Sequence, residues 1–298
     1  MNKISTYLLS LITSIFLVFM LTASSFVLLV DINASPKNLK DLAVKNELSS
    51  KIYDDINKYY SDKYNTTGIP ADVYMSALSE TYINSFVDAY IDSAFDSLES
   101  NEKMSLQYPK NQKLEENIDK FFNDFAEENN YQKDDNFYLK LRNTKENAYS
   151  TIGSYCDVYK FSAMNDHGLL PKLAKLYSRR VIVTAAVLVA TFILILLLIA
   201  FNFKKKITVM YWCGISAFAS SLIGGLPSIY LNYTRYYDSF SIKQAPVFTA
   251  FTSAMYKFTE AFTATNIAYF AISISLIVTY GIIHEKKKYP ETKPTELG

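Results

Sequence analysis

The chain has few of the residues from which most catalytic and metal sites are built. Its 298 residues include two histidines, His167 and His284, and two cysteines, Cys156 and Cys213. Two cysteines are too few for a disulfide scaffold or a multi-cysteine metal site. The motifs HExxH, CxxC and GxSxG are absent, as is a phosphate-binding glycine loop. The sequence therefore predicts a protein that is not an enzyme and that holds no metal and no cofactor.

Glycine and proline are also sparse, at 8 residues each, whereas Tyr (24) and Phe (20) are abundant. Few glycines and prolines among many apolar residues favour long, uninterrupted helices. No segment alternates polar and apolar residues between hairpin turns, so strands are not expected. The formal net charge is +1, which indicates no affinity for nucleic acid. These features predict an all-α protein, and Cys156, in a tyrosine-rich helical stripe, is expected to be a buried structural thiol.

Four long apolar runs occupy residues 4–30, 181–202, 207–224 and 261–283. A helix needs about 20 apolar residues to cross a bilayer, so each run predicts a transmembrane helix. The first run continues as "FVLLV" beyond a small-residue patch, "TASS", that is typical of a signal-peptide cleavage site. We interpret this run as a retained signal anchor, with a cleaved signal peptide as the alternative. The chain is therefore predicted to be a multi-pass protein of the cell membrane, in contact with membrane lipids.

Two lysine clusters predict the orientation. Lys204, Lys205 and Lys206 form the short loop between the second and third spans, and Lys286, Lys287 and Lys288 follow the fourth span. Basic residues in short loops stay on the cytoplasmic side of a membrane. Both clusters lie on one side in a four-span topology, so both termini are predicted to be cytoplasmic and residues 31–178 extracytoplasmic.

This topology divides the chain into seven segments. They are a first transmembrane helix at 1–30, an extracytoplasmic α-helical domain at 31–178, a second transmembrane helix at 179–203, a third at 207–231, an external loop with an interfacial helix at 232–260, a fourth transmembrane helix at 261–283, and a cytoplasmic tail at 284–298. The "GGLP" sequence at 224–227 is expected to end or kink the third span.

The segment 31–178 is acidic and has helical periodicity. It contains 24 acidic and 17 basic residues. Apolar residues recur every three or four positions, which predicts a large helical bundle inserted between the first and second spans. Expected helices run from Pro36, with Ser35 as N-cap, to about Tyr64, then over about 71–99, around 114–125 and over about 137–161. A last helix, 168–180, is expected to continue without a break into the second span.

Four charged residues near the membrane have two readings each. Arg179 and Arg180 are interpreted as side chains that reach outer-leaflet phosphates, and the alternative is a docking site for an anionic partner. Lys257 and Glu260 are three residues apart, as in helical pairs. We interpret them as part of an amphipathic segment on the outer surface, although a functional charge pair inside the membrane is the alternative.

The predicted cytoplasmic segments are too short to hold a kinase or a nucleotide-binding domain, so any signal that crosses the membrane must involve another polypeptide. We expect an interaction or sensory protein whose acidic external domain binds a protein partner in the membrane or envelope, or an envelope component. One span, a large external domain and then three spans resembles the topology of bacterial cell-division and macrolide-export ABC permeases. That resemblance implies, as the alternative, a transport-related subunit that acts with a separate ATPase. The chain departs from those permeases because only "FKKK" separates its second and third spans. High Lys, Asn, Ile and Tyr usage is typical of AT-rich bacterial genomes.

Overall fold

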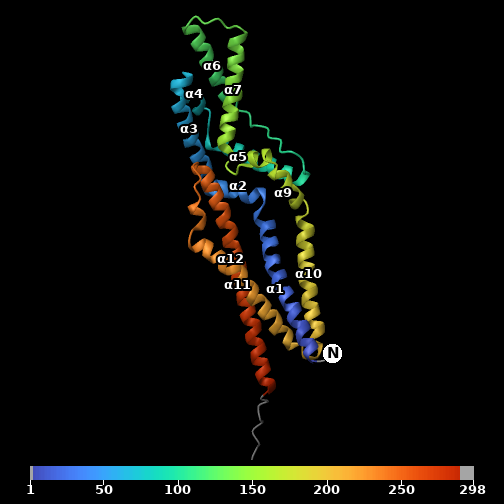
Figure 1. The fold of residues 1–298 in the computed structure, drawn as a ribbon. Coiled ribbons are helices and arrows are strands. Elements are labelled where there is room, and N and C mark those ends of the chain that lie inside the picture. The colour runs from blue at the N-terminus through green and yellow to red at the C-terminus, as the bar shows by residue number, and fades with distance from the viewer. Residues whose placement is uncertain (1–2, 289–298) are drawn as a thin grey trace, which may run out of the picture. The chain divides into compact units, whose positions relative to one another are not determined.

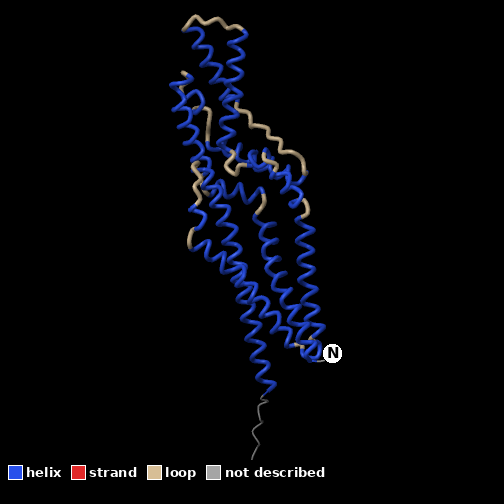
Figure 2. The backbone as a smooth tube through the Cα atoms, viewed as in Figure 1, coloured by secondary structure: helices blue, strands red, loops and turns tan. Residues whose placement is uncertain are grey.

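The computed structural model describes residues 3–288, and this part of the chain is helical without a strand (Figure 2). It divides into two compact units. The first unit contains the chain up to Ala34, Arg179–Ser239 and the chain from Tyr256 onward. The second contains Ser35–Ser178 and Phe240–Met255.

The first unit contains long apolar helices. They are α1 (Lys3–Asn33), α10 (Arg180–Phe201), α11 (Ile207–Tyr233) and most of α12 (Ala245–Lys288), with the short 3₁₀ helices η1 (Phe203–Lys205) and η2 (Tyr236–Ser239) between them. Four helices in all are long and apolar enough to cross a membrane. This agrees with the predicted multi-pass architecture.

Helix α1 lies beside α10 and α11 (Figure 1), and hydroxyl-bearing side chains join it to both. The Ser14 and Ser216 hydroxyls are 2.7 Å apart, and those of Ser24 and Thr191 are 3.0 Å apart. Lipid is as apolar as leucine, so helices in a membrane associate through close packing and interhelical hydrogen bonds rather than the hydrophobic effect. The sequence of α1 supplies the hydrogen-bonding groups, because Ser14, Thr22 and Ser24 face its neighbours.

The second unit is a helical bundle with its own hydrophobic core. Its helices are α2 (Pro36–Lys45), α3 (Leu48–Thr67), α4 (Ala71–Met75), α5 (Glu80–Ser100), α6 (Gln112–Glu128), α7 (Asp135–Cys156), α8 (Phe161–Asp166) and α9 (Leu169–Tyr177). Helices α2, α3, α7 and α9 all pack on α5. The side chains of Ile83, Phe86 and Ile91 on α5 have no exposed surface. This confirms the apolar stripe predicted on that helix.

Capping residues divide two helices that were expected to be continuous. Ser35 caps α2 as predicted, with its Oγ accepting from the Asn38 amide. The chain then breaks at Glu47, whose φ of 52° is left-handed, before α3 begins. The helix expected over 71–99 is likewise two helices, because the Ser79 hydroxyl accepts from the Tyr82 amide and starts α5 anew. Serine at an N-cap competes with helix continuation in this way.

The prediction that one continuous helix runs from 168 into the second span is wrong. Helix α9 ends at Tyr177 and α10 begins at Arg180, with Ser178 and Arg179 in a turn between them. The physical reason is local, since the backbone at Arg179 has φ −99° and ψ 0°, outside the helical range. The insertion of a flexible linker at this point would therefore not break a continuous helix.

Helix α12, in contrast to α9 and α10, is one continuous helix across a predicted boundary. Its 44 residues begin at Ala245, so residues 245–260, expected as an interfacial helix, are helical and join the fourth span without interruption. Ala250 is fully buried in the core of the second unit, whereas the chain from Tyr256 belongs to the first. Pro227 lies inside α11, which continues to Tyr233, so "GGLP" does not end the third span.

Candidate functional site

An aromatic pocket lies in the second unit between the end of α3 and the paired helices α6 and α7. Its volume is about 440 Å³. The lining is mostly apolar with a few polar groups: Thr67, Gly68, Ile69, Phe121, Phe122, Phe125, Lys140, Asn143 and Thr144. Small-molecule and peptide sites share this character, with an apolar wall and a few polar groups that set orientation.

Gly68 shapes the α3 side of the pocket. It ends α3 with a φ of 70°, and its amide donates to the Tyr64 carbonyl at 2.8 Å. Glycine adopts this left-handed conformation without the steric cost that a Cβ imposes. The Ile69 amide then donates to the Thr67 hydroxyl at 3.3 Å, which tightens the turn. The turn brings Ile69 into the pocket wall opposite α6.

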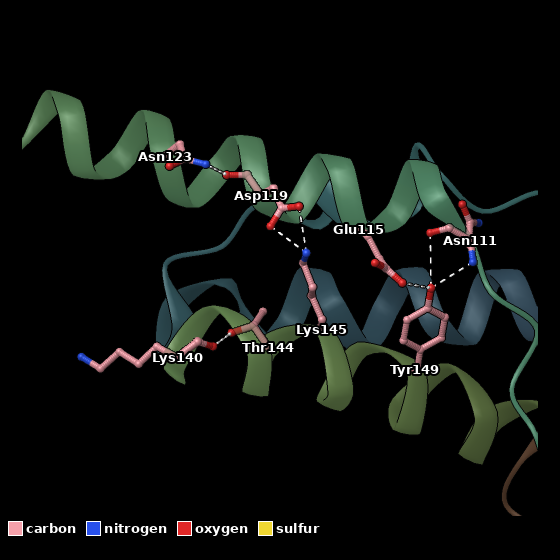
Figure 3. A network of polar contacts seen from close by, with 8 residues as sticks. All are labelled: Asn111, Glu115, Asp119, Asn123, Lys140, Thr144, Lys145 and Tyr149. Atoms are coloured by element: carbon pink, nitrogen blue, oxygen red, sulfur yellow. Dashed lines mark hydrogen bonds and ion pairs between the residues drawn. The ribbon is translucent and has the colours of Figure 1, made fainter. Parts of the chain in front are cut away.

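Polar contacts fasten α6 to α7 behind the pocket (Figure 3). The Tyr149 hydroxyl accepts from the Asn111 amide at 2.9 Å and donates to the Glu115 carboxylate at 3.0 Å. One turn further along, Lys145 pairs with Asp119 at 2.7 Å. Single exposed ion pairs contribute little, but several contacts along one interface fix the register of two helices. The register places the aromatic face of α6 opposite the first turns of α7.

Helix α6 matches the helix expected around 114–125. Leu114 and Ile118, in the first half of its apolar stripe, are buried. The C-terminal half of the stripe is different, because Phe121 and Phe122 are only partly buried and the Phe125 side chain is 51% exposed. The Phe122 ring contacts the Phe137 ring of α7 edge-on, with centroids 6.0 Å apart, whereas Phe125 stays exposed in the wall of the aromatic pocket.

A second, tyrosine-lined pocket adjoins the first and shares Thr67, Ile69 and Thr144 with it. Its volume is about 350 Å³. The rings of Tyr60 and Tyr74 stack in its wall with centroids 3.9 Å apart. Burial raises the pKa of Tyr74 to about 12 and raises the pKa of Tyr60 as well, so both phenols are neutral at pH 7.

Together the two pockets form a groove along α3 and α7, which we call the α3–α7 groove. Lys140 lines its aromatic end and Lys63 its tyrosine end. Aromatic walls with flanking ammonium groups bind apolar or aromatic groups that carry a nearby negative charge. The groove residues thus have the chemistry of a binding site.

The topology-determining lysines predicted from the sequence lie at helix ends. Lys204 and Lys205 form η1 with Phe203, and these two lysines and Lys206 are exposed. The Lys206 ammonium is 5.4 Å from the centre of the Phe203 ring. Lys286 is exposed near the end of α12, and Lys287 and Lys288 are its last residues. Their position at span ends agrees with an interfacial role but does not assign a side of the membrane.

The four charged residues predicted near the membrane lie at the start of α10 and within α12. Arg179 is exposed in the turn before α10, and Arg180, partly buried, begins α10. Lys257 and Glu260 are one turn apart inside α12, with Lys257 partly buried and Glu260 exposed. The aromatic pocket contains none of these four residues.

Sequence reasoning missed a polar network between α11 and α12. The Asn232 amide donates to Thr263 at 3.1 Å, and the Thr259 hydroxyl donates to the Asn232 side-chain carbonyl at 2.6 Å. Thr263 also donates to Ser228 at 2.9 Å. The sequence "TEAFTATN" gave one signal, because it places five polar residues around the start of the predicted fourth span. Their partners on α11 could be identified only from the packing.

The described residues hold few groups with metal-binding or nucleophilic chemistry. Within residues 3–288, no three His, Cys, Asp or Glu side chains are grouped in a way that could hold a metal ion. The Cys156 side chain is fully buried, and burial followed by the nearby Asp157 raises the pKa of its thiol. The interpretation of Cys156 as a buried structural thiol is confirmed.

The chain was also compared with known proteins. No protein-family model matches it, and neither a curated protein nor a solved structure matches it.

Proposed function

We propose that this protein is a multi-pass membrane protein whose helical second unit lies outside the cytoplasm and binds a segment of a partner in the α3–α7 groove. The observation that carries the proposal is the aromatic pocket, where Phe125 is 51% exposed beside Lys140. Exposed aromatic residues around a concavity are typical of binding surfaces, because moving their apolar surface out of water is favourable.

The chemistry of the groove defines the partner segment. An aromatic or branched apolar side chain fits against the phenylalanines of α6, and an acidic group beside it would meet Lys140. The neighbouring pocket extends the groove toward Lys63. The expected partner is therefore a protein in the membrane or envelope that presents an exposed apolar residue next to an aspartate or glutamate.

The lysine clusters support the orientation. Lys204, Lys205 and Lys206 follow the second candidate span, and Lys286 lies at the end of the fourth. In a four-span chain both clusters face one side, which the positive-inside rule makes cytoplasmic. Both termini are then cytoplasmic, and the second unit, between the first and second spans, is extracytoplasmic.

A thiol-labelling experiment tests the orientation. In a background with Cys156 and Cys213 replaced by alanine, a membrane-impermeant maleimide is added to intact cells that carry Glu102→Cys or Thr292→Cys. Glu102 is exposed after α5, whereas Thr292 is outside the described residues. We expect labelling at 102 in intact cells and at 292 only after lysis. The reverse pattern would overturn the topology.

A separate experiment tests the groove. Peptide display on the reconstituted full-length protein is expected to enrich peptides with an aromatic residue beside an acidic one. Phe125→Ala should abolish their binding, and Lys140→Glu should weaken it at least several-fold. Tyr138→Ala is the matched control, because Tyr138 is equally exposed on α7 but does not line the pocket. If the peptides bind the Phe125→Ala variant as tightly as they bind the wild type, the groove is not their binding site.

A transport-related subunit that acts with a separate ATPase is the second candidate. Helix α12 favours it, because one continuous helix contributes residues to both units. Such a helix can pass a change in the second unit to the membrane helices, as a coupled transporter requires. Co-purification of an ATPase with the detergent-solubilised protein from its host, at a fixed ratio, would favour this candidate over the first.

A further inference from the structure

Helix α9 has an apolar face that the protein leaves open. Leu170 and Ala174 are fully buried toward α5. On the adjacent face, Leu169, Leu173 and Leu176 are 48%, 42% and 71% exposed. The spacing of three and four residues places these three leucines in one stripe.

The segment that contains this stripe is basic, in contrast to the rest of the second unit. Between 167 and 180 the chain has Lys172, Lys175, Arg179 and Arg180 and no acidic residue. Both lysines of α9 are exposed and flank the leucine stripe on one side. Over residues 31–178 as a whole, acidic residues outnumber basic ones by 24 to 17. Helix α9 therefore carries positive charge on a unit that is acidic overall.

The chain also brings α9 close to a membrane entry point. Helix α10 is an apolar candidate span that begins at Arg180, three residues after α9 ends at Tyr177. Three residue steps of extended chain reach only about 10 Å. If α10 crosses the bilayer, the C-terminal end of α9 lies within that distance of the span's first residue, which is the level of the lipid headgroups.

We propose that α9 is a membrane-contacting helix, with its leucine stripe inserted among the lipids of the leaflet where α10 begins and with Lys172 and Lys175 on anionic headgroups. Apolar residues on one face and lysines beside them are typical of helices that lie in the bilayer interface. Long lysine side chains can reach phosphates while their methylene groups stay on the apolar surface. The contact would also limit how the second unit is oriented toward the bilayer.

Fluorescence quenching in liposomes tests this proposal. The full-length protein, with Cys156 and Cys213 replaced by alanine, carries a bimane label at Leu176→Cys. The matched control carries the label at Tyr138→Cys on α7, a position of similar exposure. We expect lipids with a doxyl group near the headgroup to quench position 176 several-fold more than position 138, and aqueous iodide to show the opposite preference.

The same measurement tests the charged residues. Quenching by lipid at position 176 should be stronger in vesicles of phosphatidylcholine with phosphatidylglycerol than in phosphatidylcholine alone. The double variant Lys172→Glu, Lys175→Glu should lose that difference. Equal quenching in both vesicles by the unchanged protein would refute the recognition of anionic lipid.

Two outcomes would overturn the lipid contact itself. If iodide quenches position 176 as strongly as position 138, the leucine stripe faces water. If neither quencher reaches position 176, a protein covers the stripe instead of lipid. The proposal requires α10 to be a span but does not depend on the α3–α7 groove, so peptide binding can fail while the lipid contact holds.

Discussion

Gly224 and Asn266 show how single residues set the distance between two candidate spans. A Cβ on Gly224 would lie 2.6 Å from the Asn266 Oδ1 and 2.8 Å from its Nδ2. Asn266 is buried, and its Nδ2 donates to the Phe262 carbonyl. Its Oδ1 has no hydrogen-bond partner among the described residues. The glycine therefore permits the close approach of α11 to a confined polar side chain, a device common where helices pack in membranes.

Gly224→Ala is expected to destabilise the first unit by about 1–3 kcal/mol, because the asparagine is itself buried and has little space to move. The control is Gly281→Ala on α12, where a Cβ meets nothing within 4 Å. Thermal unfolding of both variants in detergent measures the difference. Equal melting temperatures for the two variants would show that α11 and α12 do not pack through Gly224.

The buried tyrosines of the second unit predict a loss of stability in alkali. Burial raises the pKa of Tyr74 to about 12, while an unfolded tyrosine titrates near pH 10. Between these values the phenol ionises in the unfolded chain but stays neutral in the folded one, so the free energy of unfolding falls as pH rises. Below pH 10 the phenol is neutral in both states and has no effect on the pH dependence.

Tyr74→Phe should therefore reduce the drop in melting temperature between pH 9 and pH 11, and Tyr138→Phe should not. The Tyr138 side chain is exposed, so removal of its hydroxyl group is a suitable control. Circular dichroism melts of the three proteins at both pH values give the comparison. An unchanged pH dependence in Tyr74→Phe would mean that this phenol is not buried in solution.

At the scale of elements, α5 organises the second unit. Five helices pack on it, and its residue Phe86 has no exposed surface. A carboxylate at this position would be buried without a partner, which costs several kcal/mol unless the helix rearranges. The neighbouring Ser85 is exposed on the same helix, although its hydroxyl donates to the Tyr82 carbonyl.

We expect Phe86→Asp to destabilise the second unit by about 3 kcal/mol or more and Ser85→Asp by less than about 1 kcal/mol. Ser93, on the same helix, is a poorer control because its hydroxyl donates to the Ser105 carbonyl at 2.7 Å. Protection of the Cys156 thiol from a maleimide reports folding of the unit. Equal protection in both variants would contradict the assigned helical register.

At the scale of the whole molecule, α12 is the element that both units share. Labels at Val247 and Ala264 are separated by 17 residues, so a continuous helix predicts a single distance of ~26 Å between their backbone positions. Inserting two glycines after Met255 should broaden this distance distribution, because glycine weakens a helix and adds backbone freedom.

Double electron–electron resonance on the reconstituted protein measures that distribution. The control is the same insertion after Ser178, in the turn between α9 and α10, which should leave it unchanged. A broad distribution in the uninterrupted chain would show that α12 bends between its two parts. In that case the helix could not transmit a change between the units, and the transport candidate would lose its support.

The sequence alone determined the features that depend on local pattern. Length and apolarity of the four runs predict the spans, and the three-to-four-residue period predicts the buried face of α5 at Phe86. The Ser35 cap was equally readable, because a cap depends only on residues within one turn. The side of the membrane on which the second unit lies stays a prediction from the lysine clusters.

Only the tertiary structure decided what depends on contacts distant in sequence. The exposure of Phe125 results from which helices fail to cover α6, and the place of Gly224 against Asn266 results from the packing of two spans. The break at Glu47 was hidden because the helical period runs on through it. Periodicity reports that a face is apolar, but what covers that face is set by the whole fold, since each apolar stripe can pack on several others.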